Sequence, residues 1–192
     1  MLGHCIRVMG IGGTLLGVAW LSCGCPATGT VVYFDDPGLE AAIRQELGHP
    51  FGLLHREDLL GLQVLDARNR NIADLSGLEF CTNLLWLDLD TNRISDLTPL
   101  ANLTNLMVLN LDSNQIFDIS PLAGLVNLDS LSLFDNQIAD IQALDTNAVN
   151  GGLGAGDHVV LDVRHLNETA LAVDVPTLQG LGVNVITVVP EG

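Results

Sequence analysis

Four aspartates recur at a fixed spacing, and their oxygen atoms could bind a cation. They stand at every twenty-second position, at Asp74, Asp96, Asp118 and Asp140. Hard cations such as calcium bind several oxygen ligands, so a regular row of carboxylates could hold such ions. Each aspartate also lies at a predicted bend, where such side chains commonly accept hydrogen bonds from nearby backbone amides. We expect these local bonds, and the sequence leaves calcium binding open.

The histidines and the central cysteine show no catalytic or metal-binding spacing. The histidines beyond the N-terminal region are His49, His55, His158 and His165. None forms a motif such as H-E-x-x-H, so they are expected at surface or loop positions. Cys81 stands where later segments have leucine, and we expect a buried apolar residue rather than a reactive thiol. No Ser-His-Asp or Cys-His set is indicated. We therefore expect a non-catalytic chain without metal or cofactor, and a carbohydrate-active or metal-dependent enzyme is the most remote alternative.

The stretch GGLGAG at residues 151–156 contains glycines of the kind found in phosphate-binding loops. Such a loop follows a strand and opens a helix, whose N-terminal amides bind the anion. Here the glycines precede the strand-like run VVLDV, and no G-K-[ST] follows. We therefore predict a flexible loop rather than a nucleotide site.

The charge balance narrows the class of partner. The formal net charge of −16 arises from 23 acidic residues against seven basic ones, all of which are arginines. Nucleic-acid binding requires a basic surface, and adsorption to anionic lipid requires basic residues as well. The balance therefore disfavours both and favours a basic partner, although the charge could serve solubility alone.

Residues 1–25 differ in composition from the rest of the chain. His4 and Arg7 provide a short basic end, and an uncharged run follows at 8–21. This run is too short for a hydrocarbon core of about 30 Å and has the form of a secretory signal. The continuation LSCGC resembles the lipobox of bacterial lipoproteins, in which a cysteine after a small residue becomes lipidated.

The lipobox resemblance favours Cys23 as the lipidated residue, because Ser22 precedes it. Trp20 departs from the aliphatic residue that is usual three places before the cysteine. Cys25 is the alternative lipidation position, and a disulfide formed by these two cysteines is another possibility. The resemblance implies an exported protein of the cell envelope that contacts the membrane only through its lipid. Without the lipid, the protein would be periplasmic or extracellular.

An internal repeat organises the remaining chain. Leu65, Leu87, Leu109 and Leu131 share the spacing of the aspartates, within segments of the form L-x-x-L-x-L. Each segment predicts a short strand with alternate side chains directed inward. The bend that follows carries Asn92, Asn114 and Asn136, whose amides could bond the buried backbone of neighbouring turns. Stacking such turns would create one continuous core.

The repeat resembles leucine-rich repeats of the 22-residue bacterial kind found in internalins, over roughly residues 33–188. The resemblance implies an α/β-type solenoid, a short horseshoe with parallel strands on its concave face, which in this family usually recognises a protein. Arg70 and Arg164 take the asparagine place at the two ends, where atypical repeats are expected. Leu131 and Val159 lie further apart than one period, so the glycine stretch is an insertion before the last repeat.

Flanking segments are predicted to close the solenoid. Asp36 should cap a helix that begins at Pro37 and ends at Gly48, and HREDLLGL should form a second short helix. We assign residues 1–25 to the signal, 26–61 to a linker and helical N-terminal cap, and 62–188 to about five repeats. A closing helical turn and a last strand end this region, and 189–192 form a tail.

The concave face supplies the candidate contact residues: Trp86, Asp88, Asp90, Asp112 and Phe134. Neighbouring strands lie about 4.8 Å apart, so Asp66 should lie beside Asp88 and Asp90 beside Asp112, an unfavourable arrangement of like charges. Acidic residues around two aromatic side chains indicate a recognition patch for a basic or mixed protein partner.

The alternative for this face is a solvated surface of a structural envelope component that has no specific partner. Five short strands offer on the order of 400 Å², about half of a standard footprint of about 800 Å² per partner. Binding by a monomer through this face alone should therefore be weak, unless the flanking loops and the glycine insertion also take part.

Overall fold

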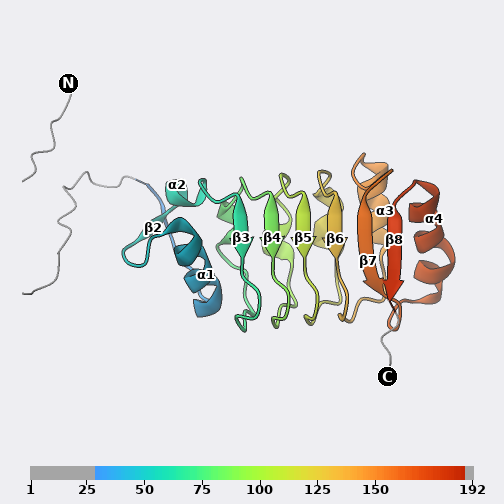
Figure 1. Cartoon of the computed structure of the whole chain (residues 1–192), viewed down its shortest axis with the longest axis horizontal. Coiled ribbons are helices and arrows are strands. Elements are labelled where there is room, and N and C mark those ends of the chain that lie inside the picture. Colours follow the sequence, from blue (N-terminus) through green and yellow to red (C-terminus); the bar gives the residue numbers. More distant parts are fainter. Residues whose placement is uncertain (1–28, 189–192) are drawn as a thin grey trace, which may run out of the picture.

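A computed structural model describes residues 29–188 and shows a leucine-rich repeat solenoid, which confirms the predicted fold class (Figure 1). Six parallel strands form one sheet in sequence order. They are β3 (Val64–Asp66), β4 (Trp86–Asp88), β5 (Val108–Asn110), β6 (Ser130–Ser132), β7 (His158–Asp162) and β8 (Asn184–Val188). The side of the sheet that faces away from the helices is called the strand face below.

The strands are paired in the register that the repeat period predicts. Leu65, Leu87, Leu109 and Leu131 lie side by side, and Val159 continues the row in β7. All five side chains are buried, because alternate residues of a strand point to opposite sides of a sheet. No single turn could bury these side chains alone, so the core exists only through stacking.

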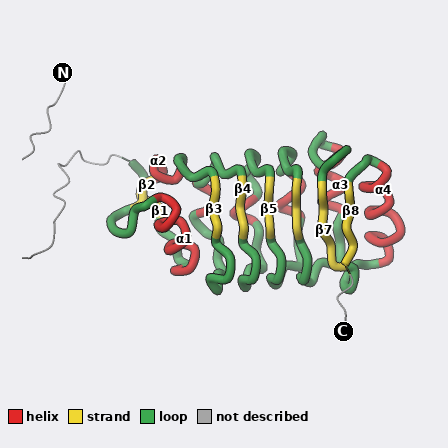
Figure 2. The backbone as a smooth tube through the Cα atoms, in the orientation of Figure 1, coloured by secondary structure: helices red, strands yellow, loops and turns green. Residues whose placement is uncertain are grey.

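Short helices form the layer behind the sheet (Figure 2). Three 3-10 helices connect the first four strands: η1 (Leu78–Phe80), η2 (Thr98–Leu100) and η3 (Ser120–Gly124). Pro99 and Pro121 stand at the start of η2 and η3, where proline costs no backbone hydrogen bond. Buried leucines of these helices, such as Leu100 and Leu122, complete the core from behind.

An N-terminal cap covers the first turn of the solenoid. The helix α1 (Pro37–Leu47) begins after Asp36, whose Oδ1 accepts hydrogen bonds from the amides of Gly38 and Leu39. Asp36 Oδ2 accepts from the amide of Ala73 at 2.8 Å, so one carboxylate caps the helix and joins it to the first turn. Gly48 ends the helix with φ of 65°. The hairpin β1 (Val31–Val32) and β2 (Leu54–His55) and the short helix α2 (Arg56–Leu59) complete the cap.

The insertion before β7 contains a helix as well as the predicted glycine loop. The helix α3 (Gln142–Val149) takes the place that 3-10 helices occupy in earlier turns. The extended spacing between β6 and β7 provides room for this longer helix, which the prediction of a simple loop did not include. Buried Asn147 then holds the glycine stretch, because its Oδ1 accepts from the amide of Leu153 at 2.8 Å.

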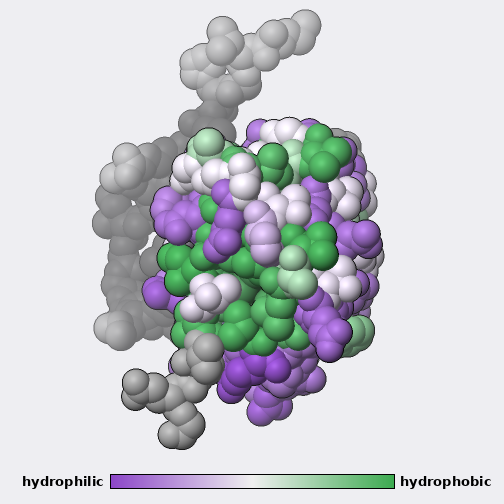
Figure 3. All heavy atoms as spheres, turned by 90° about the vertical axis from the view of Figure 1, so that its right-hand side faces the viewer, coloured by the Kyte–Doolittle hydropathy of each residue, from purple (hydrophilic) through white to green (hydrophobic). Residues whose placement is uncertain are grey.

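The closing helical turn and last strand predicted from the sequence are present, and the strand joins the sheet as its sixth member. After a π-helical turn η4 (Ala170–Asp174) and the helix α4 (Val175–Gly180), β8 pairs with β7 and ends the sheet. This end of the molecule presents a broad apolar surface (Figure 3). Its exposed apolar side chains include Leu171, Val173, Leu181 and Ile186.

Several predictions concern residues beyond those that the structure describes. The signal at 1–25, the lipidation positions Cys23 and Cys25, and the tail at 189–192 lie outside residues 29–188. Within 29–188, no helix combines the length and the apolar composition that crossing a bilayer requires.

Candidate functional site

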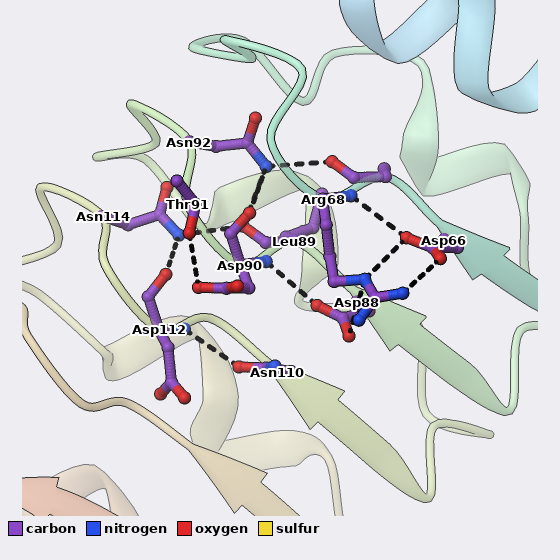
Figure 4. Close-up of polar contacts among 11 residues, drawn as sticks. Asp66, Arg68, Asp88, Leu89, Asp90, Thr91, Asn92, Asn110, Asp112 and Asn114 are labelled. Atoms are coloured by element: carbon purple, nitrogen blue, oxygen red, sulfur yellow. Dashed lines mark hydrogen bonds and ion pairs between the residues drawn. The ribbon is translucent and has the colours of Figure 1, made fainter.

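A ladder of three buried asparagines fixes the bend after the strands. Asn114 Nδ2 donates to the carbonyl oxygens of Leu89, Leu111 and Asp112 at 3.0, 3.1 and 2.9 Å. Its Oδ1 accepts from the amide of Ile94 at 3.0 Å. Each asparagine therefore bonds its own turn and the preceding turn, as Figure 4 shows for Asn92 and Asn114.

The other two asparagines repeat this pattern in their own turns. Asn92 Oδ1 accepts from Ile72, and Asn136 Oδ1 accepts from Ile116. The residue before each ladder asparagine has a positive φ: 56° at Thr91, 52° at Ser113 and 54° at Asp135. This conformation is unfavourable for residues other than glycine. The ladder bonds hold the bend in this conformation.

A second, exposed row of asparagines stands at the opposite end of the strands. Asn83, Asn105 and Asn127 each donate to a carbonyl oxygen of the preceding turn, at 2.8, 2.8 and 2.7 Å. These residues were not singled out from the sequence, although they recur with the same period as the leucines. The two rows fix both ends of the strand face, so its side chains project from an ordered backbone.

The repeated aspartates make local hydrogen bonds. The Oδ1 atoms of Asp74, Asp96, Asp118 and Asp140 each accept from the amide two residues later at 2.8 Å. These bonds cap the start of the following turn or helix, as expected for aspartates at bends. Within residues 29–188, no three histidine, cysteine or acidic side chains converge on a position suited to a metal ion.

Asp66 and Asp88 lie side by side as predicted, but an arginine separates their charges (Figure 4). Arg68 donates to both oxygens of Asp66, at 3.0 and 2.7 Å, and its Nε lies 3.5 Å from Asp88 Oδ2. The hydrogen bond from Arg68 lowers the pKa of Asp66. The positive guanidinium group of Arg68 therefore offsets the predicted repulsion between the two carboxylates, because it contacts both of them.

Asp88 is buried, which corrects its prediction as an exposed contact residue. Its side chain is only 7% exposed, and its Oδ1 accepts from the amide of Asp90 at 3.0 Å. Burial raises the pKa of Asp88, although the hydrogen bond from Asp90 opposes this effect. Asp88 thus positions the chain after β4, whereas Asp90 remains partly exposed.

Asp112 also bonds within the protein. Its Oδ1 accepts from Ser132 Oγ at 2.6 Å and from the amide of Phe134 at 2.7 Å. Burial raises the pKa of Asp112, against the effect of these two bonds. One carboxylate therefore joins the bend after β5 to the chain that leaves β6, and it fixes the backbone of Phe134.

The two candidate aromatic residues are half-buried and do not form one cluster. Trp86 is the first residue of β4, beside Val64 and Val108 in the neighbouring strands. Phe134 follows the end of β6, so β5 and the length of a strand separate it from Trp86. The strand face thus carries two separate aromatic positions with partly exposed Asp90 at the bend after β4.

The remaining candidate chemical groups, one cysteine and four histidines, lie at separate places in the fold. Cys81 is fully buried, and burial raises the pKa of its thiol to about 12. His55 precedes α2 and lies against Asp58, with Nδ1 3.6 Å from Oδ2. His49, His158 and His165 are exposed. Arg164 pairs with Asp162 and Asp135 near the end of β7, a contact that repeat spacing alone could not predict.

Comparisons with known proteins agree with this geometry. A family model described as leucine-rich repeats (2 copies) matches residues 104–146. Internalin C from Listeria monocytogenes serotype 1/2a (strain EGD / Mackaness) is 41% identical over 58 residues, which are 29% of this chain and 20% of that protein. The matched segment therefore spans about a fifth of this curated relative.

Two solved structures share the fold. An internalin, InlF, from Listeria monocytogenes str. 4b F2365 is 28% identical with a TM-score of 0.68, and the match covers 82% of this chain and 45% of that one. The functional domain of InlJ from Listeria monocytogenes, described as including a cysteine ladder, is 26% identical with a TM-score of 0.57. This second match covers 69% of this chain and 29% of the InlJ chain.

Proposed function

We propose that this chain, a bacterial internalin-like leucine-rich repeat protein, is a non-catalytic module of the cell envelope that recognises a protein partner. The observation that carries the proposal is the strand face itself. Two asparagine rows hold its backbone at both ends, while partly exposed side chains project from it. An ordered backbone reduces the entropy lost on binding, so such a face is suited to recognition.

The contacts within the strand face divide the candidate residues into two groups. Trp86, Asp90 and Phe134 are partly exposed and are proposed to contact the partner. Asp88 and Asp112 are proposed to act as positioning residues, because their carboxylates already accept hydrogen bonds from the protein. The net charge of −16 favours a partner with basic residues at its contact surface.

The size of the strand face supports a weak interaction or a larger contact area. Six strands at about 4.8 Å spacing, each about 10–17 Å long, give a face of roughly 300–500 Å². A standard partner footprint is about 800 Å². We therefore propose that the monomer contacts its partner through the strand face together with the loops beside the strands.

The proposed location is the cell envelope, after export by the signal at residues 1–25 and lipidation at Cys23. Without lipidation, the protein would be periplasmic or extracellular. A structural envelope component without a specific partner is the second candidate function. This structural role predicts a different experimental result from protein recognition, because substitutions on the strand face would then change no interaction with another protein.

The test compares proteins retained from an envelope extract by two baits, each spanning residues 26–192. One bait has the native sequence, and the other carries Trp86→Ala, Asp90→Asn and Phe134→Ala. Phe117→Ala provides a matched control, because it truncates an aromatic side chain that is 66% exposed and lies between β5 and η3. Circular dichroism shows whether all baits are folded.

A protein retained by the native and Phe117→Ala baits, but lost by the triple variant, is the expected result. Equal retention by all three baits would contradict recognition through the strand face. The structural alternative would then be favoured.

A further inference from the structure

A groove of about 450 Å³ runs along the edge where the strands begin. The segment between α3 and β7 rises above the neighbouring loops at this edge and borders the groove (Figure 1). The groove residues used below are Leu85, Met107, Val126, Asp129, Gly152 and Asp157. These positions precede the strands or belong to the insertion, so the groove adjoins the strand face without being part of it.

Two exposed apolar side chains lie at one end of the groove. Leu85 is 37% exposed and Met107 is 43% exposed. They lie on neighbouring turns, since the amide of Met107 donates to the carbonyl oxygen of Leu85 at 2.9 Å. The next turns carry Asp129 and Asp157 at the same place before their strands. The groove therefore changes from apolar to acidic along its length.

The insertion forms an ordered wall at the acidic end. A Cβ atom at residue 152 would lie 2.1 Å from Asn147 Oδ1 and 3.0 Å from Val126 Cα, so only glycine permits this close packing. Asp157 Oδ2 accepts from the amide of Gly154 at 2.7 Å and fixes the return of the chain toward β7. The glycine stretch thus packs against the preceding turn and closes the groove.

We infer that this groove binds an extended segment of a partner protein in which an apolar side chain is followed or preceded by arginine or lysine. The apolar side chain would pack on Leu85 and Met107, and the basic side chain would pair with Asp129 and Asp157. This chemistry follows from charge complementarity, because both carboxylates belong to a chain with net charge −16.

The spacing of the turns sets the spacing of the two partner residues. Neighbouring strands are about 4.8 Å apart, and the midpoint of Leu85 and Met107 lies two turns from the midpoint of Asp129 and Asp157, a separation of about 10 Å. An extended segment advances about 3.3 Å per residue. The apolar and basic residues of the partner should therefore lie about three positions apart.

This inference rests on the proposed function, because it names the chemistry of one segment of the partner. It concerns the strand-start edge, however, and so can be tested apart from the strand face. The chain holds three methionines, at residues 1, 9 and 107. Methyl labelling with carbon-13 therefore gives the full chain few signals in a nuclear magnetic resonance spectrum, and Met107→Leu identifies the groove signal.

The probe is a blocked hexapeptide, Gly-Leu-Gly-Gly-Arg-Gly, titrated to millimolar concentration. One matched peptide carries glutamate in place of arginine, and another carries serine in place of leucine. We expect the Leu/Arg peptide to move the Met107 methyl signal in a saturable manner. The two matched peptides should bind several-fold more weakly, because each loses one of the two complementary contacts.

Three variants assign the effect to the groove. Asp129→Asn with Asp157→Asn should weaken binding on the order of fivefold, since two exposed ion pairs are worth about 0.5 kcal/mol each. Leu85→Ser should weaken it to a similar extent while leaving Met107 as reporter. Phe117→Ala, outside the groove lining, should leave the titration unchanged.

An unmoved Met107 signal, or equal movement by the arginine and glutamate peptides, would overturn the inference. Neither result would bear on the bait comparison for the strand face. Conversely, a saturable shift of Met107 together with equal retention by all three baits would support the groove and contradict the strand-face proposal.

Discussion

Replacing Asn114 by alanine should destabilise the solenoid far more than replacing an exposed asparagine. The substitution removes the only hydrogen bond found for the buried amide of Ile94 within residues 29–188. It also removes three bonds donated to carbonyl oxygens, but each of these oxygens retains another partner. Leu89 O still accepts from Asn92, Leu111 O still accepts from Asn136, and Asp112 O still accepts from the amide of Thr91.

The expected loss of stability follows from the difference between an amide that loses its only partner and carbonyl oxygens that keep another one. A buried amide left without a hydrogen-bond partner costs about 1–3 kcal/mol, and each of the three partly replaced bonds contributes about 0.5 kcal/mol. The expected loss in the free energy of unfolding is therefore about 2.5–4.5 kcal/mol, a large share of the roughly 5–15 kcal/mol typical of a domain. Asn105 provides the control, because its exposed side chain makes one bond, to Thr82 O at 2.8 Å. Asn105→Ala should cost less than about 1 kcal/mol.

Urea unfolding followed by far-ultraviolet circular dichroism measures both variants. Equal losses for Asn114→Ala and Asn105→Ala would refute the reasoning, because burial of the ladder would then have no energetic consequence. A loss for Asn114→Ala that is accompanied by a changed dependence on urea would indicate a different unfolding transition instead.

Four further predictions concern the titration of Asp145, the reactivity of Cys81, the hydrogen bond of Asp118 and the effect of a calcium chelator. Burial and the nearby charge of Asp174 raise the pKa of Asp145 to about 6, so stability present in acid is lost as pH rises through that value. Asp145→Asn should therefore raise the free energy of unfolding by on the order of 1–2 kcal/mol at pH 7.5, a value reduced from the full shift because Asp145 is partly exposed. Unfolding curves of the two proteins at pH 3, below the ordinary pKa of the carboxyl group, should show no difference. Because burial raises the pKa of the Cys81 thiol to about 12, iodoacetamide at pH 8 should label Cys81 only after the protein is unfolded in urea. Peptide mass spectrometry measures this labelling, and rapid labelling of Cys81 in the folded protein would contradict its burial. Asp118→Ala should lower stability by about 0.5–2 kcal/mol through loss of the bond to Ser120, whereas Asp118→Asn retains the acceptor. A calcium chelator should leave the melting temperature of the native protein unchanged, and a clear decrease would show that the aspartates hold an ion.

The period of the sequence was sufficient to predict the parallel strands and their register. Leucines repeated at a constant spacing can be buried together only by stacking, and Leu65, Leu87 and Leu109 occupy the predicted row. The cap helix was predictable from Asp36 and Gly48, because helix ends have local signals. These features depend on residues close in sequence or related by the period.

The side-chain contacts of the strand face were less predictable. Arg68 interacts with Asp66 and Asp88, and this geometry depends on a rotamer rather than on the repeat. Asp112 reaches Ser132 and Phe134 in the next turn, which converts an expected contact residue into a positioning residue. The period placed these residues on one face but did not determine which carboxylates already had partners.

The helix α3 and the sixth strand lie where the period breaks down. The extended segment between Leu131 and Val159 leaves several ways to fill the connecting arc, and helix formation at Gln142–Val149 is one of them. In the closing segment, Val185 replaces leucine and the asparagine is absent, so the sequence predicted a last strand there but not the register in which β8 pairs with β7. Packing against the preceding turn determines both elements.

The asparagine ladder makes the length of the solenoid adjustable in whole turns. Asn92 and Asn114 accept from residues 20 positions earlier and donate to carbonyl oxygens 25 positions earlier. Excision of one repeat unit between Leu87 and Leu109 would bring Asn114 into the place of Asn92, opposite Ile72 and Ala67. Every buried backbone group at the junction would then regain a partner of the same kind. Gene duplication or loss of such units could therefore lengthen or shorten the strand face without any change in the hydrogen bonds that fix the bend.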